Sequence, residues 1–129
     1  MKQITEDYVS YETAKLLKEK GVDFIDCVTY YCEGRPKEVD YSFLEETNST
    51  WEERCCQAPT HQMTLKWLRE VHNIYIDILT YITGKNIQFR WVGYNKGRLF
   101  SQEEGKIIYF NSYEGAVEAA LKYTLENLI

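Results

Sequence analysis

The chain has 129 residues, of which 44% are hydrophobic and 15% aromatic, and its formal net charge is −5. This composition excludes an intrinsically disordered chain, because such chains combine low hydrophobicity with high net charge. No apolar run reaches the 18 residues of a membrane-spanning helix, and the polar start gives no sign of a secretory signal peptide. We therefore expect a single soluble, cytoplasmic domain over residues 1–129 that contacts no membrane.

Three helices are predicted from capping residues and apolar periodicity. The first begins after Ser10 and ends at Gly21, the second begins after Thr60 and ends at Asn73, and the third begins after Ser112. The side chains expected on their buried faces are Leu65, Leu68 and Val71, with Met63 and Trp67 beside them, and then Val117, Ala120, Leu121, Thr124, Leu125 and Leu128.

Strict alternation over residues 74–82 predicts a strand rich in isoleucine. Gly84 and Lys85 suit a two-residue turn into a second strand. The resulting register pairs Ile82 with Ile87, Thr80 with Phe89 and Ile78 with Trp91 on one apolar face, and Tyr81 with Gln88 and Leu79 with Arg90 on the other. We expect the apolar face to pack on the core.

A third strand is predicted at residues 106–110, and the glycines at 93, 97 and 105 are interpreted as turn residues. Residues 22–57 carry weaker signals. Residues 26–33 fit a strand that ends at Gly34-Arg35-Pro36, residues 41–44 fit a shorter one, and residues 46–54 fit an ordered loop. The predicted class is α+β, with three helices packed on a small antiparallel sheet and a C-terminal order of helix, three strands and helix.

The cysteines and histidines are the one set of residues that could ligate a transition metal: Cys27, Cys32, Cys55, Cys56, His61 and His72. Their spacing departs from that of zinc sites, which place ligands two to four residues apart on a tight turn. We expect no metal site and four free, mostly buried thiols, because disulfides are rare in cytosolic proteins.

No catalytic constellation is evident. His61 and His72 lie at opposite ends of one predicted helix, about 16 Å apart at the rise of an α-helix, so they cannot share a site. Acidic pairs such as Glu45-Glu46 lie in polar stretches, and there is no glycine-rich phosphate loop. We therefore expect neither an enzyme nor a cofactor.

Charge is distributed unevenly, which bears on nucleic-acid binding. Residues 21–60 hold nine acidic residues against three basic ones, whereas residues 61–105 hold six basic residues against four acidic ones. An acidic chain is poorly suited to binding phosphates over a broad surface, so nucleic acid is not the expected partner.

The order of elements from residue 60 nevertheless resembles that of a double-stranded-RNA-binding domain. That family has lysines at the start of its last helix, where this chain has Ser-Tyr-Glu-Gly at residues 112–115. A basic hairpin over residues 85–98 could still form a stacking surface for single strands, with Lys85, Arg90, Lys96 and Arg98 interleaved with aromatic residues. A nucleic-acid-binding module is therefore the alternative function.

Three segments, SYETAKLLKEKG, APTHQMTLKWLREVHNI and NSYEGAVEAALKYTLENLI, together resemble small uncharacterised proteins of phages, prophages and mobile elements of Bacteroides-type bacteria. The most specific part is Pro59-Thr60 followed by residues 66–73. The resemblance implies an accessory protein made in a bacterial cytosol, and it implies no activity or functional residue.

The leading hypothesis is a non-enzymatic accessory protein that binds a host or phage protein, with a homodimer as a further option. The acidic, aromatic-bearing stretch over residues 33–53, which contains Tyr41 and Trp51, is the expected contact surface. Trp67 is a further candidate because tryptophan is common at interface hot spots, although a core position is favoured for it.

Overall fold

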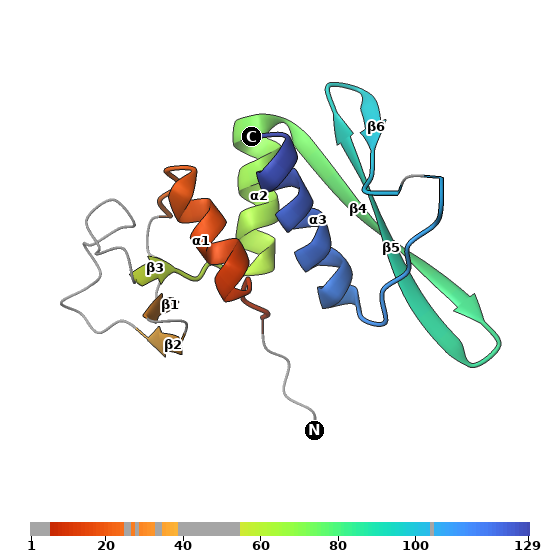
Figure 1. The fold of residues 1–129 in the computed structure, drawn as a ribbon, viewed down its shortest axis with the longest axis horizontal. Helices are drawn as coiled ribbons and strands as arrows, with labels where there is room; N and C mark the ends of the chain where they lie inside the picture. Colours follow the sequence, from red (N-terminus) through yellow and green to blue (C-terminus); the bar gives the residue numbers. More distant parts are fainter. Residues whose placement is uncertain (1–5, 25–26, 28, 33–34, 39–54, 104) are drawn as a thin grey trace. The chain divides into compact units, whose positions relative to one another are not determined.

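The computed structural model describes residues 6–24, 27, 29–32, 35–38, 55–103 and 105–129 (Figure 1). These residues form helices and two three-stranded antiparallel sheets, so the predicted α+β class is confirmed. The chain divides into two compact units, one up to His61 together with Ile129 and one from Gln62 to Leu128. The single domain over residues 1–129 stays a prediction. No helix in the described part of the chain is long and apolar enough to cross a membrane.

In the first unit, α1 (Tyr11–Glu19) begins and ends as predicted. The Oγ atom of Ser10 accepts a hydrogen bond of 3.2 Å from a backbone N–H of the first turn. Gly21 has a φ of 74°, and the N–H of Val22 donates to the carbonyl of Leu17 at 3.0 Å. This bond closes the last turn in the manner of a Schellman motif.

The sheet of the first unit has the strand order β2-β1-β3. Its strands are β1 (Thr29–Cys32), β2 (Arg35–Glu38) and β3 (Cys55–Gln57). The predicted strand over residues 26–33 therefore exists in part. It ends before Gly34 as expected, but the prediction missed that β2 begins at Arg35, which pairs with Cys32.

Two further predictions cannot be placed. The short strand over residues 41–44 and the loop over residues 46–54 lie outside the described residues.

A buried side-chain amide holds the chain beside β3. The amide nitrogen of Gln57 donates to the carbonyl oxygen of Phe24 at 2.8 Å, and its amide oxygen accepts from the N–H of Phe24 at 2.7 Å. Nearby, the hydroxyl of Tyr31 donates to the carbonyl of Val9 at 2.7 Å. Side chains thus satisfy backbone groups that no strand pairs with, as burial requires.

The helix α2 (His61–His72) starts directly after Thr60. It ends at Asn73, whose φ of 57° is a left-handed conformation that asparagine tolerates. Both boundaries agree with the prediction.

The buried side of α2 differs from the predicted one. Leu65 and Leu68 are buried as expected, together with Thr64. Val71, expected in the core, is 64% exposed. Val71 lies three residues after Leu68, on the same side of the helix, so its exposure shows that the buried part of α2 ends before the last turn.

In the second unit, β4 (Ile74–Thr83) and β5 (Asn86–Asn95) form the predicted hairpin (Figure 1). Gly84 in its turn has a φ of 61°. The pairing agrees with the expected register at every predicted pair: Ile82 with Ile87, Tyr81 with Gln88, Thr80 with Phe89, Leu79 with Arg90 and Ile78 with Trp91.

The third strand is not where the sequence places it. It is β6 (Arg98–Phe100), which follows β5 through a second two-residue turn at Lys96 and Gly97, with φ values of 53° and 78°. Residues 106–110 make one bridge, in which Phe110 and Phe89 exchange backbone hydrogen bonds of 2.8 and 2.7 Å. The prediction of a strand over residues 106–110 is therefore wrong.

The helix α3 (Tyr113–Asn127) packs on β5 and β4. Ser112 caps it as predicted, accepting a hydrogen bond of 3.0 Å from the N–H of Gly115. The predicted buried residues are buried with one exception. Leu128 is 36% exposed, because the helix ends at Asn127 and the residue follows its last turn.

Candidate functional site

The outer edge of β4 is the most unusual feature of the second unit. In the sheet order β4-β5-β6, β4 is an edge strand of ten residues. Within the described ranges, no strand pairs with its outer side. An edge strand presents a row of backbone donors and acceptors that can pair with another chain.

The turn determines which residues of β4 direct their backbone groups outward. Thr83 and Asn86 flank a two-residue turn, so they form the hydrogen-bonded pair next to it. Hydrogen-bonded pairs alternate along an antiparallel ladder, so the odd-numbered residues of β4 bond to β5. The even-numbered residues therefore present N–H and C=O groups at the outer edge: Ile74, Ile76, Ile78, Thr80 and Ile82.

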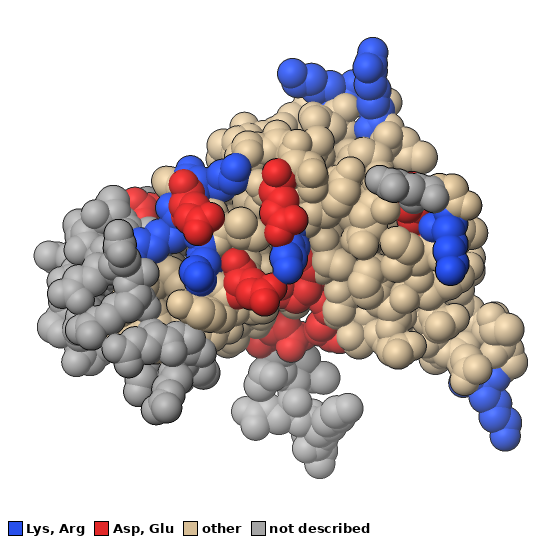
Figure 2. Space-filling view, viewed as in Figure 1, with Lys and Arg blue, Asp and Glu red and all other residues tan. Residues whose placement is uncertain are grey.

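Both faces of the hairpin are apolar and exposed near its turn. Ile82 is 72% exposed and Ile87 53%, on one face, while Leu79 and Tyr81 are 37% and 36% exposed on the other. We call these four residues the hairpin tip. Figure 1 shows the turn of the hairpin extending beyond α3, and Figure 2 shows a mostly uncharged surface there.

The expectation that the whole apolar face lies in the core is therefore wrong. Trp91 is 2% exposed, whereas Phe89 is only half-buried and Ile82 and Ile87 are exposed. The helix α3 covers the half of the sheet around Trp91, where Tyr123 contacts that ring with centroids 5.5 Å apart.

The basic residues proposed for nucleic-acid contact do not gather into one patch. Lys85 lies in the β4–β5 turn and Lys96 in the β5–β6 turn, at opposite ends of a ten-residue strand. That separation is about 35 Å at the rise of a β-strand. Figure 2 shows Lys and Arg side chains in separate groups at these two ends of the sheet. Arg98 lies on β6 beside the second turn, and Arg90 lies between the two ends.

Arg90 has an intramolecular partner. Its Nε atom donates to Oε1 of Glu103 at 3.0 Å, and its Nη1 atom donates to the hydroxyl of Tyr81 at 3.3 Å. The other carboxylate oxygen of Glu103 accepts the N–H of Ile108 at 2.8 Å. Glu103 thus ties the segment after β6 to β5, and the pair gives Arg90 a structural role.

The pKa values of this pair follow from their contacts. Burial tends to raise the pKa of Glu103, but hydrogen bonds from Arg90 and Ile108 outweigh burial and lower it below its ordinary value of 4.5. The hydrogen bond to Glu103, followed by that to Tyr81, raises the pKa of Arg90. Both groups are charged at neutral pH.

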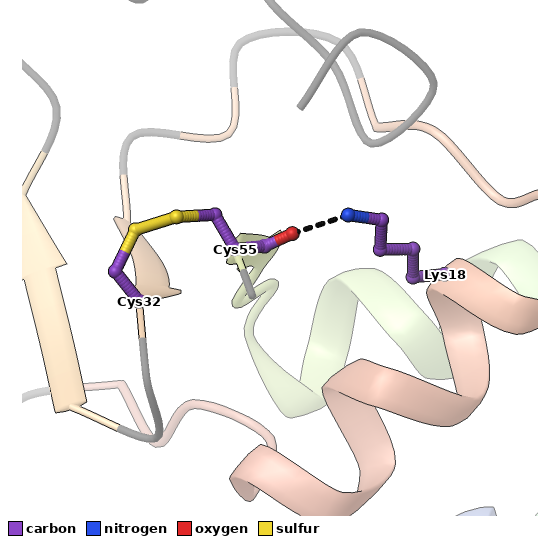
Figure 3. The surroundings of a disulfide bond; sticks show 3 residues. All are labelled: Lys18, Cys32 and Cys55. Carbon is purple, nitrogen blue, oxygen red and sulfur yellow. Dashed lines mark hydrogen bonds between the residues drawn. A yellow bond between two sulfur atoms is a disulfide. The ribbon is translucent and has the colours of Figure 1, made fainter. Parts of the chain in front are cut away.

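Two of the four cysteines form a disulfide, contrary to the expectation of four free thiols. Cys32 and Cys55 lie directly opposite each other on β1 and β3, with Cα atoms 4.2 Å apart (Figure 3). They come together because β1 and β3, which are separated by β2 in the sequence, are neighbours in the sheet. The ammonium of Lys18 on α1 donates to the carbonyl of Cys55 at 2.5 Å, so the helix is tied to the same residue.

Cys27 and Cys56 remain thiols. Burial raises the pKa of Cys56 to about 11, against a smaller opposing effect of Lys18 and Lys15. Burial likewise raises the pKa of Cys27. Both thiols are therefore protonated at neutral pH, which makes them poor nucleophiles. In the described part of the chain, no group of three or more His, Cys, Asp or Glu side chains could hold a metal ion.

The predicted partner-binding residues are only partly placed. Trp67 is half-buried on α2, and its ring meets that of His72 edge-on with centroids 4.8 Å apart. Tyr41 and Trp51 lie outside the described residues, as does most of the stretch over residues 33–53. A role of these three residues in binding stays a prediction.

A shallow pocket of about 180 Å³ lies beside α3, lined by Gln102, Ala119, Lys122, Tyr123 and Glu126. Pockets for small organic ligands are larger, typically about 300 Å³ or more. The hairpin is therefore the better candidate for a functional surface.

The hairpin tip and the edge of β4 were missed by sequence reasoning. Their residues were recognised as a strand, but the pattern indicates which face is apolar and not how much of it another element covers. No protein-family model, curated protein or solved structure matches this chain.

Proposed function

We propose that this chain is a non-enzymatic protein that acts by protein–protein interaction through the β4–β5 hairpin. One observation carries the proposal: four large apolar side chains, those of the hairpin tip, are exposed on a single hairpin. Large apolar side chains that are exposed close together on a small protein commonly mark an interaction site.

The cost of exposure supports the same conclusion. Complete burial of an isoleucine side chain is worth about 1.5–3 kcal/mol, and in the isolated chain Ile82 forgoes most of that gain and Ile87 about half of it. Polar residues at these two positions would leave the turn of the hairpin unchanged. A partner that covers them recovers the lost free energy.

The setting is part of the proposal. By its resemblance to phage and mobile-element proteins, the chain is an accessory protein of a bacterial cytoplasm, with a host or phage protein as a candidate partner. The cytosol keeps most thiols reduced. In that compartment Cys32 and Cys55 would face each other as thiols, and alkylation in intact cells would modify both.

Affinity capture tests the role of the hairpin. Tagged wild-type chain and an Ile82→Lys/Ile87→Lys variant are incubated with lysate of host cells that also express the untagged chain, and captured proteins are quantified by mass spectrometry. We expect the captured amount of at least one protein to fall about tenfold or more in the variant. The untagged chain counts as one of these proteins.

The matched control is Thr83→Lys/Asn86→Lys, which adds the same charge beside the same turn at polar positions. It should capture like the wild type. Equal capture by all three chains would contradict the proposed function. Circular dichroism of each variant verifies that the fold is retained.

A further inference from the structure

We infer that the edge of β4 pairs with β4 of a second copy of this chain, which forms one continuous antiparallel six-stranded sheet. This inference rests on the proposed function, because it names the partner of the same hairpin. In its sequence and its pairing, β4 lacks the usual protection of an edge strand. Its sequence IYIDILTYIT contains no Lys, Arg or Pro, and its pairing with β5 runs without a bulge.

Two copies of β4 are complementary to each other along their outer edges. The outward backbone groups belong to even-numbered residues, and antiparallel pairing of two such edges about a two-fold axis matches donors with acceptors. For both copies to present the same face on the same side of the sheet, even-numbered residues must lie opposite even-numbered ones and odd-numbered residues opposite odd-numbered ones. The two-fold axis then passes between the two copies of one residue. The possible registers differ in which residue that is.

Asp77, the only charged residue of β4, discriminates among the central registers. A register centred on Asp77 places two carboxylates directly opposite, and one centred on Ile78 leaves them diagonal, about 7–8 Å apart. A register centred on Leu79 places Asp77 opposite the partner's Tyr81. The hydroxyl of Tyr81 accepts a hydrogen bond from Arg90, so Asp77 would lie near the Arg90–Glu103 ion pair of the other copy and not opposite a second Asp77.

The Leu79-centred register also gives new neighbours to exposed apolar side chains of β4. It pairs residues 75–83 of both copies over about 30 Å. Ile82 lies opposite the partner's Ile76, so each exposed end of the hairpin lies beside the end of β4 next to α2. Leu79 lies opposite the partner's Leu79. Tyr75, at 47% exposure, gains a neighbour in the partner's Thr83.

Sedimentation of the purified chain tests the pairing. We expect wild type to be a dimer at micromolar concentration and Thr80→Pro to raise the dissociation constant about 100-fold or more. Proline at Thr80 removes an outward N–H that does not bond to β5, and edge strands tolerate proline. Thr80→Val keeps the N–H and should dimerise like the wild type.

Cross-linking tests the register and does not depend on the proline variant. In this register the two Leu79 residues form a non-hydrogen-bonded pair with Cα atoms about 4.5 Å apart, which a disulfide can span. Leu79→Cys should therefore cross-link into a dimer under mild copper-catalysed air oxidation. Tyr75→Cys is the matched control on the same face of the same strand, because its two copies would lie about 26 Å apart. Wild type, which carries Cys27 and Cys56, gives the background.

The outcomes separate this inference from the proposed function. A chain that stays monomeric at about 100 μM, or equal cross-linking at positions 75 and 79, overturns the inference. If the monomeric chain still captures another protein through the hairpin tip, the proposed function stands. A monomer whose β4 edge is protected from hydrogen exchange would mean that the chain covers its own edge, which also overturns the pairing.

Discussion

The ring of Phe100 lies against the backbone of Gly93, where an added Cβ atom would come within 2.2 Å of the ring. The two residues face each other across β5 and β6. The same ring meets Trp91 and Tyr123 at centroid distances of 5.9 and 6.3 Å. Gly93 is therefore part of the packing of the sheet, and its interpretation as a turn residue is wrong.

Gly93→Ala should destabilise the chain, because the ring of Phe100 must move out of this aromatic cluster. Overpacking of this kind costs about 1–3 kcal/mol of unfolding free energy, measured by urea titration. The double-mutant cycle with Phe100→Ala is decisive, because Gly93→Ala should cost nothing once the ring is gone. An unchanged cost in the Phe100→Ala background would show that the ring is not the cause.

Glu103 should make stability depend on pH in the acid range. Because the pKa of Glu103 is lowered on folding, the unfolded chain binds a proton more readily, and the carboxylate stabilises the fold above its ordinary value of 4.5. This contribution is lost as the pH falls through the lowered pKa. Urea titrations from pH 3 to 7 should show a smaller acid loss for Glu103→Gln than for wild type.

The matched control for this experiment is Glu126→Gln, which alters an exposed glutamate on α3. Its pH dependence should follow that of the wild type. Parallel curves for Glu103→Gln and wild type would mean that the bond to Arg90 contributes no pH-dependent stability.

Reduction of the disulfide should destabilise the first unit. Cys32 and Cys55 are 23 residues apart, and closing a loop of this length in the unfolded chain is worth about 3 kcal/mol. Cys32→Ser/Cys55→Ser should lose about the same free energy as treatment with dithiothreitol, and dithiothreitol should then have no further effect. Cys27→Ser keeps a donor for the Thr29 carbonyl and should cost much less. A double variant as stable as the oxidised wild type would refute the prediction.

We expect weak nucleic-acid binding. The four basic residues of the alternative function are spread along the sheet, and Arg90 is bonded to Glu103. Fluorescence anisotropy with labelled RNA and single-stranded DNA should give dissociation constants no tighter than about 100 μM at physiological salt, which is the weak limit of non-specific binding. Micromolar, strongly salt-dependent binding that Lys96→Ala/Arg98→Ala abolishes would favour the alternative instead.

Local signals predicted much of the fold. Ser10, Gly21 and Ser112 mark helix ends because each satisfies backbone groups of the neighbouring turn. The turn at Gly84-Lys85 sets the register of β4 and β5, since a two-residue turn leaves one pairing. Gly97 is a turn residue as predicted. The prediction places no strand directly after the turn at Lys96-Gly97, however, and therefore puts the third strand at residues 106–110 instead of Arg98–Phe100.

Features that depend on distant parts of the chain were not predicted. The Cys32–Cys55 disulfide needs β1 and β3 to pair, and no local pattern indicates that pairing. The exposure of Val71 and Ile82 depends on how far other elements extend over α2 and the hairpin. The candidate site was missed for the same reason. A strand lies at an edge when no other strand pairs with one of its sides, and the sequence of the strand itself does not indicate this.

The bond between Cys32 and Cys55 also changes how the chain is connected. Together with the backbone between them it makes residues 32–55 a closed covalent ring. A protease that cuts this ring once opens it without releasing a fragment, and the two pieces separate only after a reductant is added. A single peptide-bond break between these two cysteines would therefore leave β1 and β3 covalently attached.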